Sequence, residues 1–284
     1  MAPQVLRTLD EVKTWAAGLR REGRRLALVP TMGYLHEGHL SLMREGRKRA
    51  DVVATSIFVN PTQFGPKEDL ARYPRDFDGD LAKCASAGAD AVFAPEPGAM
   101  YPPGYQTYVE VTEVSQGLCG ERRPGHFRGV ATIVTQLLAL FRPDVALFGE
   151  KDYQQLQVIK ALNRDLHLGA DIVGMPTVRE PDGLAMSSRN AYLSEEERKR
   201  ALAISRGMGA AQALFKAGTL QASALTEAVR RELRAANLRE DYVELVDAER
   251  LTPLSTLSAG QSARLMVAVF CGATRLIDNQ PVGG

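Results

Sequence analysis

Two histidines in a glycine-rich segment are the residues whose types and spacing point most directly to chemistry. Residues 30–39 read PTMGYLHEGH and place His36 and His39 three positions apart. At the start of a helix, two such imidazoles can lie side by side and donate hydrogen bonds to phosphate oxygens. Gly33 and Gly38 allow the backbone to approach a phosphate closely. The segment therefore predicts an anion site. The alternative interpretation is that the histidines only cap the helix.

Three better-known motifs do not fit the sequence. The spacing from Gly33 to Gly38 imitates a P-loop, but His39 and the following leucine stand where Lys and Ser or Thr are required. The zinc-protease pattern fails because the two histidines are one residue too close. Residues 207–212 imitate a dinucleotide fingerprint, but they lie inside a capped helix. None of the four histidines falls in an apolar core pattern, which favours a ligand site over core packing.

A second polar cluster, FGEKDYQQ at residues 148–155, stands between a predicted strand and a predicted helix. Glu150 and Asp152 flank Lys151, so the lysine should stay protonated and can meet a phosphate as a point charge. Gln155 lies one helical turn further on and offers both a donor and an acceptor to a small polar substrate. The alternative interpretation is an ordinary charged helix start with Asp152 as its N-cap.

A third cluster, MSSRN at residues 186–190, combines two hydroxyl groups with a guanidinium. Such a loop could close over a polyphosphate, because arginine binds phosphate oxygens bidentately and serines add neutral donors. Its alternative interpretation is a polar linker. Lesser candidates are NPTQF at 60–64 and a basic loop at 122–128. Asp78 and Asp80 could approach a magnesium ion or simply complement a helix dipole.

The elements that must position these clusters follow an alternating pattern in the first half of the chain. Short apolar runs alternate with amphipathic stretches, which is typical of a parallel sheet covered by helices. In such a sheet the residues after each strand face a common crevice, and the next helix N-terminus offers free N–H groups to anions. We therefore predict a doubly wound, Rossmann-like α/β domain. Its strands are expected at 25–29, 52–59, 91–94, 145–148 and 171–173, and its helices at 9–19, 39–49, 76–87, 130–141 and 152–166.

The second half groups its helices and strands differently. Ser194 and Glu197 predict the start of one long helix that ends at Gly218. A second helix follows around residues 225–233, and strands are expected at 242–246 and 265–270. This order predicts a smaller α+β domain. We place the boundary in the Gly- and Pro-rich stretch at 174–181, giving domains of residues 1–177 and 178–284.

Composition narrows the class of protein. With 35 basic and 34 acidic residues, the net charge of +1 provides no field for holding nucleic acid or an anionic membrane surface. The three cysteines, Cys84, Cys119 and Cys271, form no metal or redox spacing and favour a reducing compartment. No stretch approaches the ~18 apolar residues of a membrane span. The sequence predicts a soluble, cytoplasmic protein that binds its anions locally.

Together the motifs closely resemble the pantothenate synthetases (pantoate–β-alanine ligases) of the HIGH-type nucleotidyltransferase superfamily. The resemblance covers essentially the whole chain and rests on PTMGYLHEGH, FVNPTQF, GEKDYQQ and PTVREPDGLAMSSRNAYL, in that order. Two departures are Tyr34, where a small residue is common, and Gly125, where Thr or Arg is usual.

The resemblance implies that (R)-pantoate is condensed with β-alanine to pantothenate through a pantoyl adenylate. ATP is the implied co-substrate and Mg²⁺ the implied cofactor, and AMP and pyrophosphate are released. It implies that His39 donates a proton, with His36, Lys151 and Arg189 also catalytic. Gln63 and Gln155 are expected to bind pantoate, with Gln63 also near β-alanine. A homodimer is implied too, and the apolar strand at 52–59 is one surface for it. The ATP contacts implied by the resemblance are Met32, Gly33, His36, Gly38, His39, Gly149, Glu150, Lys151, Asp152, Val178, Met186, Ser187, Ser188 and Arg189.

Two rival functions remain open at this stage. One is another nucleotidyltransferase of the superfamily, which would leave the nucleotide on its product. The other is a nucleotide-sensing module without turnover, for which the helix-end phosphate contacts alone would suffice. The presence of both Lys151 and the segment Ser187–Arg189 favours an enzyme over a sensor.

Overall fold

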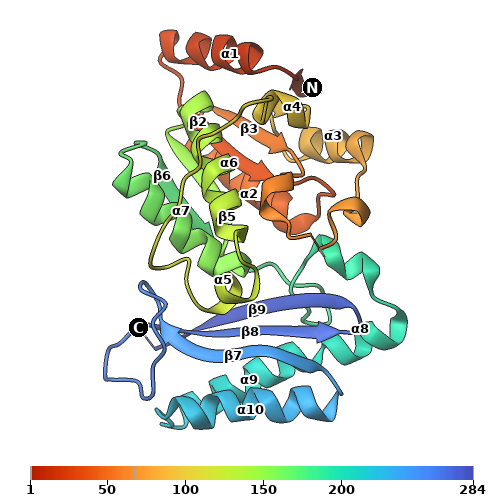
Figure 1. Ribbon diagram of the computed structural model, residues 1–284, viewed down its shortest axis with the longest axis vertical. Coiled ribbons are helices and arrows are strands. Elements are labelled where there is room, and N and C mark those ends of the chain that lie inside the picture. Colours follow the sequence, from red (N-terminus) through yellow and green to blue (C-terminus); the bar gives the residue numbers. More distant parts are fainter. Residues whose placement is uncertain (1, 67, 284) are drawn as a thin grey trace.

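The computed structural model describes residues 2–66 and 68–283 and contains two sheets, each with its own helices (Figure 1). The larger sheet is parallel throughout, and its strand order is β1-β4-β3-β2-β5-β6. This arrangement confirms the predicted doubly wound α/β fold. The strands are β1 (Gln4–Leu6), β2 (Leu26–Thr31), β3 (Val52–Ile57), β4 (Ala91–Phe93), β5 (Val145–Gly149) and β6 (Asp171–Met175).

The strand order reverses between β2 and β5, and this point determines where the polar clusters meet. From β2 the chain builds outward through β3 and β4, then crosses back to place β5 on the other side of β2. Ala27 lies opposite Val145 and Leu28 opposite Ala146 in the two neighbouring strands. Ligands of doubly wound sheets bind in the crevice at such a switch point, outside the carboxyl ends of the strands.

Helices cover both faces of this sheet because its strands carry apolar residues on both sides. Along β2, Leu26 and Leu28 pack toward α1, α6 and α7, whereas Ala27 and Val29 pack toward α2 and α3. The alternation of side chains along a strand explains this division. The helices are α1 (Leu9–Arg21), α2 (Glu37–Arg49), α3 (Phe77–Ser86), α6 (His126–Phe141) and α7 (Tyr153–Asp165), with short α4 (Pro97–Met100) and α5 (Leu118–Arg122) between them.

The second sheet is antiparallel with the order β7-β8-β9. In Figure 1 it lies between α9 and α10 on one side and the larger sheet with its helices on the other. One face packs on α9 and α10, and the other contacts Leu118 and Tyr153. This confirms a smaller α+β part. Its elements are α8 (Glu195–Ala201), α9 (Ala203–Lys216), α10 (Ala222–Ala235), β7 (Arg239–Asp247), β8 (Ala263–Cys271) and β9 (Thr274–Val282).

Some details differ from the sequence expectations. The helix expected from Ser194 to Gly218 is two helices, α8 and α9, separated at Leu202. The strands β1 and β9 were not expected. Strand β3 is hydrogen-bonded on both sides, and its first five residues are buried, so it cannot serve as a dimer surface. All strands of the larger sheet precede residues 177–178 in sequence, and all strands of the smaller sheet follow them. The exact domain boundary stays a prediction.

Candidate functional site

The turn after β2 is held in place by a buried carboxylate. Gly33 and Tyr34 have φ angles of 82° and 48°, the left-handed region that glycine adopts freely and tyrosine rarely. Asp80 of α3, which is 1 % exposed, accepts hydrogen bonds from the amides of Tyr34 and Leu35, both at 2.6 Å. Its two oxygens therefore fix the turn that leads into α2. This contact gives Asp80 a structural task and does not support the interpretation of Asp80 as a magnesium ligand.

His36 and His39 lie together at the start of α2, as their spacing predicts. Their ring centroids are 4.1 Å apart with a 36° tilt. The His36 amide donates to Nδ1 of His39 at 3.3 Å, so part of the capping interpretation also holds. A Cβ atom on Gly38 would lie 2.9 Å from the His36 ring, which explains the need for glycine there.

Both imidazoles are neutral at pH 7. Burial, reinforced by Lys151, lowers the pKa of His36 to about 4, and burial together with His36 lowers the pKa of His39 to about 3. Because Nδ1 of His39 accepts a hydrogen bond, the proton of the neutral ring resides on Nε2. His39 can thus donate a hydrogen bond from Nε2 without carrying a charge.

The cluster after β5 is divided between two environments. It begins with the 3₁₀ turn η3 (Glu150–Asp152) and continues into α7. Nζ of Lys151 lies 3.7 Å from a carboxylate oxygen of Asp152, whereas Glu150 pairs with Arg264 of β8. Partial desolvation in the crevice would raise the pKa of Asp152, whose side chain is 48 % exposed, but the charges of Lys151 and Arg189 outweigh this effect and lower that pKa. Asp152 precedes α7 but makes no side-chain capping bond, contrary to the simple helix-start interpretation.

The segment at residues 178–192 approaches the same crevice. Its backbone folds back on itself, with the amide of Met186 donating to the carbonyl of Val178 at 3.0 Å. The segment ends in the 3₁₀ helix η4 (Ser188–Tyr192), where the Ser188 hydroxyl donates to the carbonyl of Tyr34 at 3.3 Å. The Arg189 guanidinium makes two bonds of 2.9 Å to Asp69. The third cluster therefore contacts the first directly.

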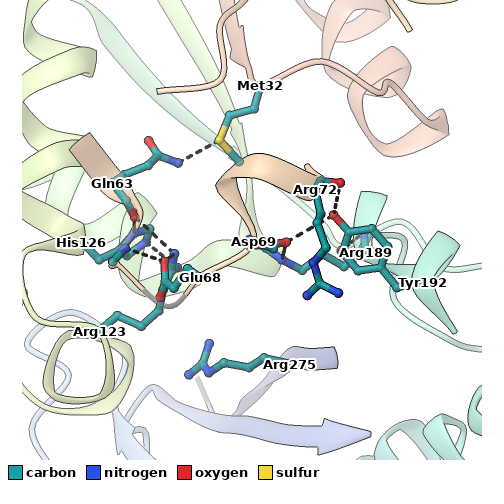
Figure 2. A network of polar contacts seen from close by, with 12 residues as sticks. Met32, Gln63, Glu68, Asp69, Arg72, Arg123, His126, Arg189, Tyr192 and Arg275 are labelled. Carbon is teal, nitrogen blue, oxygen red and sulfur yellow. Dashed lines mark hydrogen bonds and ion pairs between the residues drawn. The ribbon is translucent and has the colours of Figure 1, made fainter. Parts of the chain in front are cut away.

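Gln63 belongs to a buried polar network that Figure 2 displays. It lies in the short 3₁₀ helix η1 (Pro61–Gln63) and is 7 % exposed. Its side-chain amide donates to the sulfur of Met32 at 2.9 Å and accepts from Asn60 at 3.1 Å. Its backbone carbonyl accepts from Nδ1 of His126 at 2.8 Å. Hydrogen bonds to the side-chain nitrogen, the side-chain oxygen and the backbone carbonyl thus hold Gln63 at the edge of the crevice.

Two residues of the basic loop at 122–128, the lesser candidate named above, complete this network, and their partner Glu68 was not anticipated. His126 is 9 % exposed, so the expectation that no histidine lies in the interior is wrong for this residue. Arg123 binds Glu68 through bonds of 2.6 and 2.7 Å and also contacts Nε2 of His126 at 3.0 Å (Figure 2). Glu68, 55 residues away, carried no motif. Gly125 has φ 81° directly before α6, so its departure from the family pattern suits the local backbone.

One cavity of about 210 Å³ collects most of the residues expected to bind ligands. It lies outside the ends of β2 and β5. Gly33 and Glu150 do not line it: Gly33 lies in the turn against Asp80, and Glu150 points toward Arg264. The lining residues among those expected are Met32, His36, Gly38, His39, Gln63, Gly149, Lys151, Asp152, Gln155, Val178, Met186, Ser187, Ser188 and Arg189.

A second cavity of about 620 Å³ adjoins the first and extends toward β7, β8 and β9. The two share Lys151, Asp152, Gln155 and Arg189 among their lining residues. Arg275 and Tyr242 of the smaller sheet line its far side. The crevice is therefore continuous from the switch point of the large sheet to the face of the small one.

Two features are absent from the described part of the chain. Across residues 2–66 and 68–283, no three His, Cys, Asp or Glu side chains gather closely enough to hold a metal ion. Within the same ranges, no helix combines the length and apolar character needed to cross a bilayer.

The fold and the site define a doubly wound α/β protein whose crevice at the switch point is suited to phosphate. His36, His39, Lys151 and Arg189 line this crevice. Residues 4–281 match the sequence pattern of the pantoate-beta-alanine ligase family. The chain belongs to this family and is a ligase.

Individual relatives agree over nearly the full length. A pantothenate synthetase of Myxococcus xanthus (strain DK1622) is 79% identical, with coverage of 100% of this chain and 98% of the relative. The crystal structure of pantothenate synthetase from Thermus thermophilus superimposes with a TM-score of 0.92 at 45% identity, covering 99% and 100% of the two chains. The crystal structure of pantoate-beta-alanine ligase from Francisella tularensis is described as complexed with beta-gamma ATP and beta-alanine. It superimposes with a TM-score of 0.82 at 32% identity, covering 98% of this chain and 97% of that chain.

Proposed function

We propose that this chain condenses (R)-pantoate with β-alanine at the expense of ATP, forming pantothenate, AMP and pyrophosphate through a pantoyl adenylate. The observation that carries the proposal is one cavity lined by His36, His39, Lys151 and Arg189 beside two glutamines. The Francisella tularensis relative, whose crystals contain an ATP compound and β-alanine, supports the same pair of ligands.

The proposed chemistry proceeds in two balanced steps. First, a pantoate carboxylate oxygen attacks the α-phosphorus of ATP, and the bond to the bridging oxygen of the β-phosphate breaks as pyrophosphate leaves. Second, the amine of β-alanine attacks the acyl carbon, the bond to the AMP oxygen breaks as AMP leaves, and the amine loses a proton to water. Neither step requires a protein nucleophile, because the mixed anhydride activates the carboxylate. The enzyme's tasks are positioning and stabilisation of phosphate charge.

The side chains are assigned to these tasks by charge and place. Lys151 and Arg189 neutralise the β- and γ-phosphates, with Ser187 and Ser188 as neutral donors. Gln63 and Gln155 bind pantoate, and Gln63 also lies near the incoming amine. The nucleotide is framed by backbone and side chains of the remaining expected ATP contacts that line the cavity, namely Met32, Gly38, Gly149, Asp152, Val178 and Met186. Gly33 and Glu150 lie outside the cavity and are not assigned to the nucleotide.

His39 is assigned a hydrogen bond from Nε2 to a phosphate oxygen. With a pKa of about 3 the His39 ring is neutral in the free enzyme. It would therefore stabilise the negative charge of a bound phosphate as a dipole. A proton-donor role, as the family resemblance implies, requires bound phosphate to raise this pKa, which a nearby negative charge does.

Mg²⁺ is proposed to accompany ATP. Among the described residues, Asp152 is the one carboxylate that lines the smaller cavity, and its hard oxygen atoms suit magnesium. Asp152 would thus be the protein ligand, with the others supplied by phosphate oxygens and water. The ion would add positive charge beside the transferring phosphate.

A coupled assay tests the function. Purified chain is mixed with ATP, Mg²⁺, pantoate and β-alanine, and the products are identified by mass; AMP, pyrophosphate and the amide are expected. Without β-alanine, labelled pyrophosphate should exchange into ATP only when pantoate is present. A product that retains the nucleotide would favour another nucleotidyltransferase, and ATP binding without turnover would favour a sensor. A cytoplasmic homodimer remains part of the proposal, and light scattering of the purified chain measures its mass.

A further inference from the structure

Asn279 connects the small sheet to the backbone of the candidate phosphate-binding lysine. It lies in β9, is 4 % exposed, and follows Lys151 by 128 positions in sequence. Its side-chain amide donates to the carbonyl oxygens of Glu150 and Lys151, at 2.8 and 2.9 Å. Both N–H bonds of the amide are thereby used on two consecutive peptide units of η3.

This pair of bonds constrains the turn that presents Lys151. The 3₁₀ turn η3 joins β5 to α7, and the carbonyls of Glu150 and Lys151 each accept a hydrogen bond from Asn279 of β9. A buried carbonyl without a partner is costly, so these two peptide units have one strongly favoured orientation. Fixing the backbone at Lys151 also fixes the origin of its side chain in the cavity.

Contacts on either side strengthen the same connection. Arg264 of β8 pairs with Glu150, and its guanidinium carbon lies 3.8 Å from the centre of the Tyr153 ring. The Tyr153 hydroxyl donates to the carbonyl of Ala248 at 2.9 Å. The small sheet and the turn that follows β7 thus contact Glu150 and Tyr153, on either side of Lys151, while Asn279 contacts Lys151 itself.

The neighbour of Asn279 holds the other phosphate-binding segment. Asp278 is 3 % exposed and accepts bonds of 2.6 and 2.9 Å from Arg179. Arg179 pairs with Ala185 in an isolated bridge, immediately before the segment that carries Arg189. Successive strand residues point to opposite faces, so β9 can hold two loops at once.

We propose that Asn279 is a positioning residue for the adenylation reaction and that it acts through Lys151. The inference rests on the proposed function of Lys151 as a phosphate contact. It assigns the small sheet a direct part in building the phosphate site, in addition to covering the crevice.

The test uses the full chain with the near-isosteric change Asn279→Asp and the milder Asn279→Ala. The aspartate places an oxygen where both carbonyls expect a donor, so we expect kcat/KM for ATP in pantoate-dependent pyrophosphate exchange to fall at least ~10-fold. KM for pantoate should stay within about twofold, since Gln63 is held by a separate network and Gln155 is carried by α7 rather than by η3. A purely structural defect would change both parameters together.

Gln280 supplies the matched control. Its side-chain amide donates to the carbonyl of Met208 in α9 at 2.6 Å, which is a comparable bond one residue away that does not reach the crevice. Gln280→Ala should lower the melting temperature by an amount similar to Asn279→Ala while leaving the exchange rate within about twofold of the unmodified chain.

A double-mutant comparison decides whether Asn279 acts through Lys151. In a Lys151→Ala background, Asn279→Asp should have little further effect on exchange, because the group that it positions is absent. The same fold-loss in both backgrounds would overturn the proposal, as would unchanged kinetics in folded Asn279→Asp. Unfolding of both Asn279 variants would also overturn it, since Asn279 would then serve general stability. Failure of the unmodified chain to exchange pyrophosphate would instead refute the proposed function.

Discussion

Lowering the pH from 7 to 5 should destabilise this protein through His126 by an amount that can be derived from its contacts. The carbonyl of Gln63 can only accept, so Nδ1 of His126 carries the proton, and Nε2 accepts from Arg123. Burial and the positive charge of Arg123 lower the pKa of this imidazole to about 3, against an ordinary value of 6.5. The folded protein therefore keeps His126 neutral under conditions in which the unfolded chain protonates it.

The sign and size follow from proton linkage. Below pH 6.5 the unfolded state binds a proton that the folded state does not, so the free energy of unfolding falls as the pH decreases toward 3. Each pH unit in this window costs about 1.36 kcal/mol for one group. The loss from pH 7 to pH 5 is thus about 2 kcal/mol from His126, and His36 and His39, with lowered pKa values, change stability in the same direction.

Urea unfolding at pH 7 and pH 5 measures this effect in the unmodified chain and in His126→Asn. Asparagine can still donate to the carbonyl of Gln63 but does not titrate, so its loss on acidification should be smaller by about 2 kcal/mol. His167→Asn is the control, because His167 is exposed and has φ 52°, a conformation that asparagine tolerates. This control should follow the unmodified chain. Parallel pH dependences for His126→Asn and the unmodified chain would refute the assignment of a neutral, buried His126.

Three further predictions concern the crevice. Folded His39→Ala and Lys151→Ala should each lower pantoate-dependent pyrophosphate exchange at least ~100-fold, as loss of a transition-state charge contact does, and near-normal exchange would remove the proposed roles. Because the pKa values of His36 and His39 are about 4 and 3, kcat/KM for ATP should show no histidine ionisation between about pH 5.5 and 8. An acidic limb near the ordinary histidine pKa of about 6.5 that disappears in His36→Asn would contradict their neutrality. Asp80→Asn should lower the free energy of unfolding, measured with urea, by about 1–3 kcal/mol, because the Tyr34 or Leu35 amide would then face a donor. Equal stability of the variant would show that these two hydrogen bonds to Asp80 contribute little.

The large sheet and the residues after its strands could be predicted because their signals are local. Apolar runs and the glycines beside His36 are all recognisable within one short window of sequence. In a doubly wound sheet, strand ends converge by topology alone. The proximity of the His36 and Lys151 clusters therefore followed from knowing only that each comes after a strand of one parallel sheet.

The missed features depend on partners far away in the sequence. Strand β9 is rich in polar residues, and its alternation was not recognisable because Asp278 and Asn279 are buried against loops rather than exposed. The basic loop at 122–128 was a candidate because of its charge, and the burial of His126 could not be predicted from it, because Glu68, which pairs with Arg123, lies in a different loop. Polar residues become part of an interior only through such pairings, and a single sequence does not display them.

The ion pairs of the crevice bear on how a protein with a net charge of +1 would bind the triphosphate of the proposed reaction. Lys151 lies beside Asp152, Arg123 beside Glu68 and Arg189 beside Asp69, with N···O distances of 3.7, 2.6 and 2.9 Å. In the proposed reaction, the phosphates must compete with Asp69 for the Arg189 guanidinium. The β- and γ-phosphates together carry more negative charge than one aspartate, so the exchange favours the bound nucleotide. Arg123 and Arg189 are already neutralised by Glu68 and Asp69 before the nucleotide arrives, so they attract other anions weakly. The proposed site would then discriminate in favour of a triphosphate because a triphosphate can displace an aspartate from Arg189.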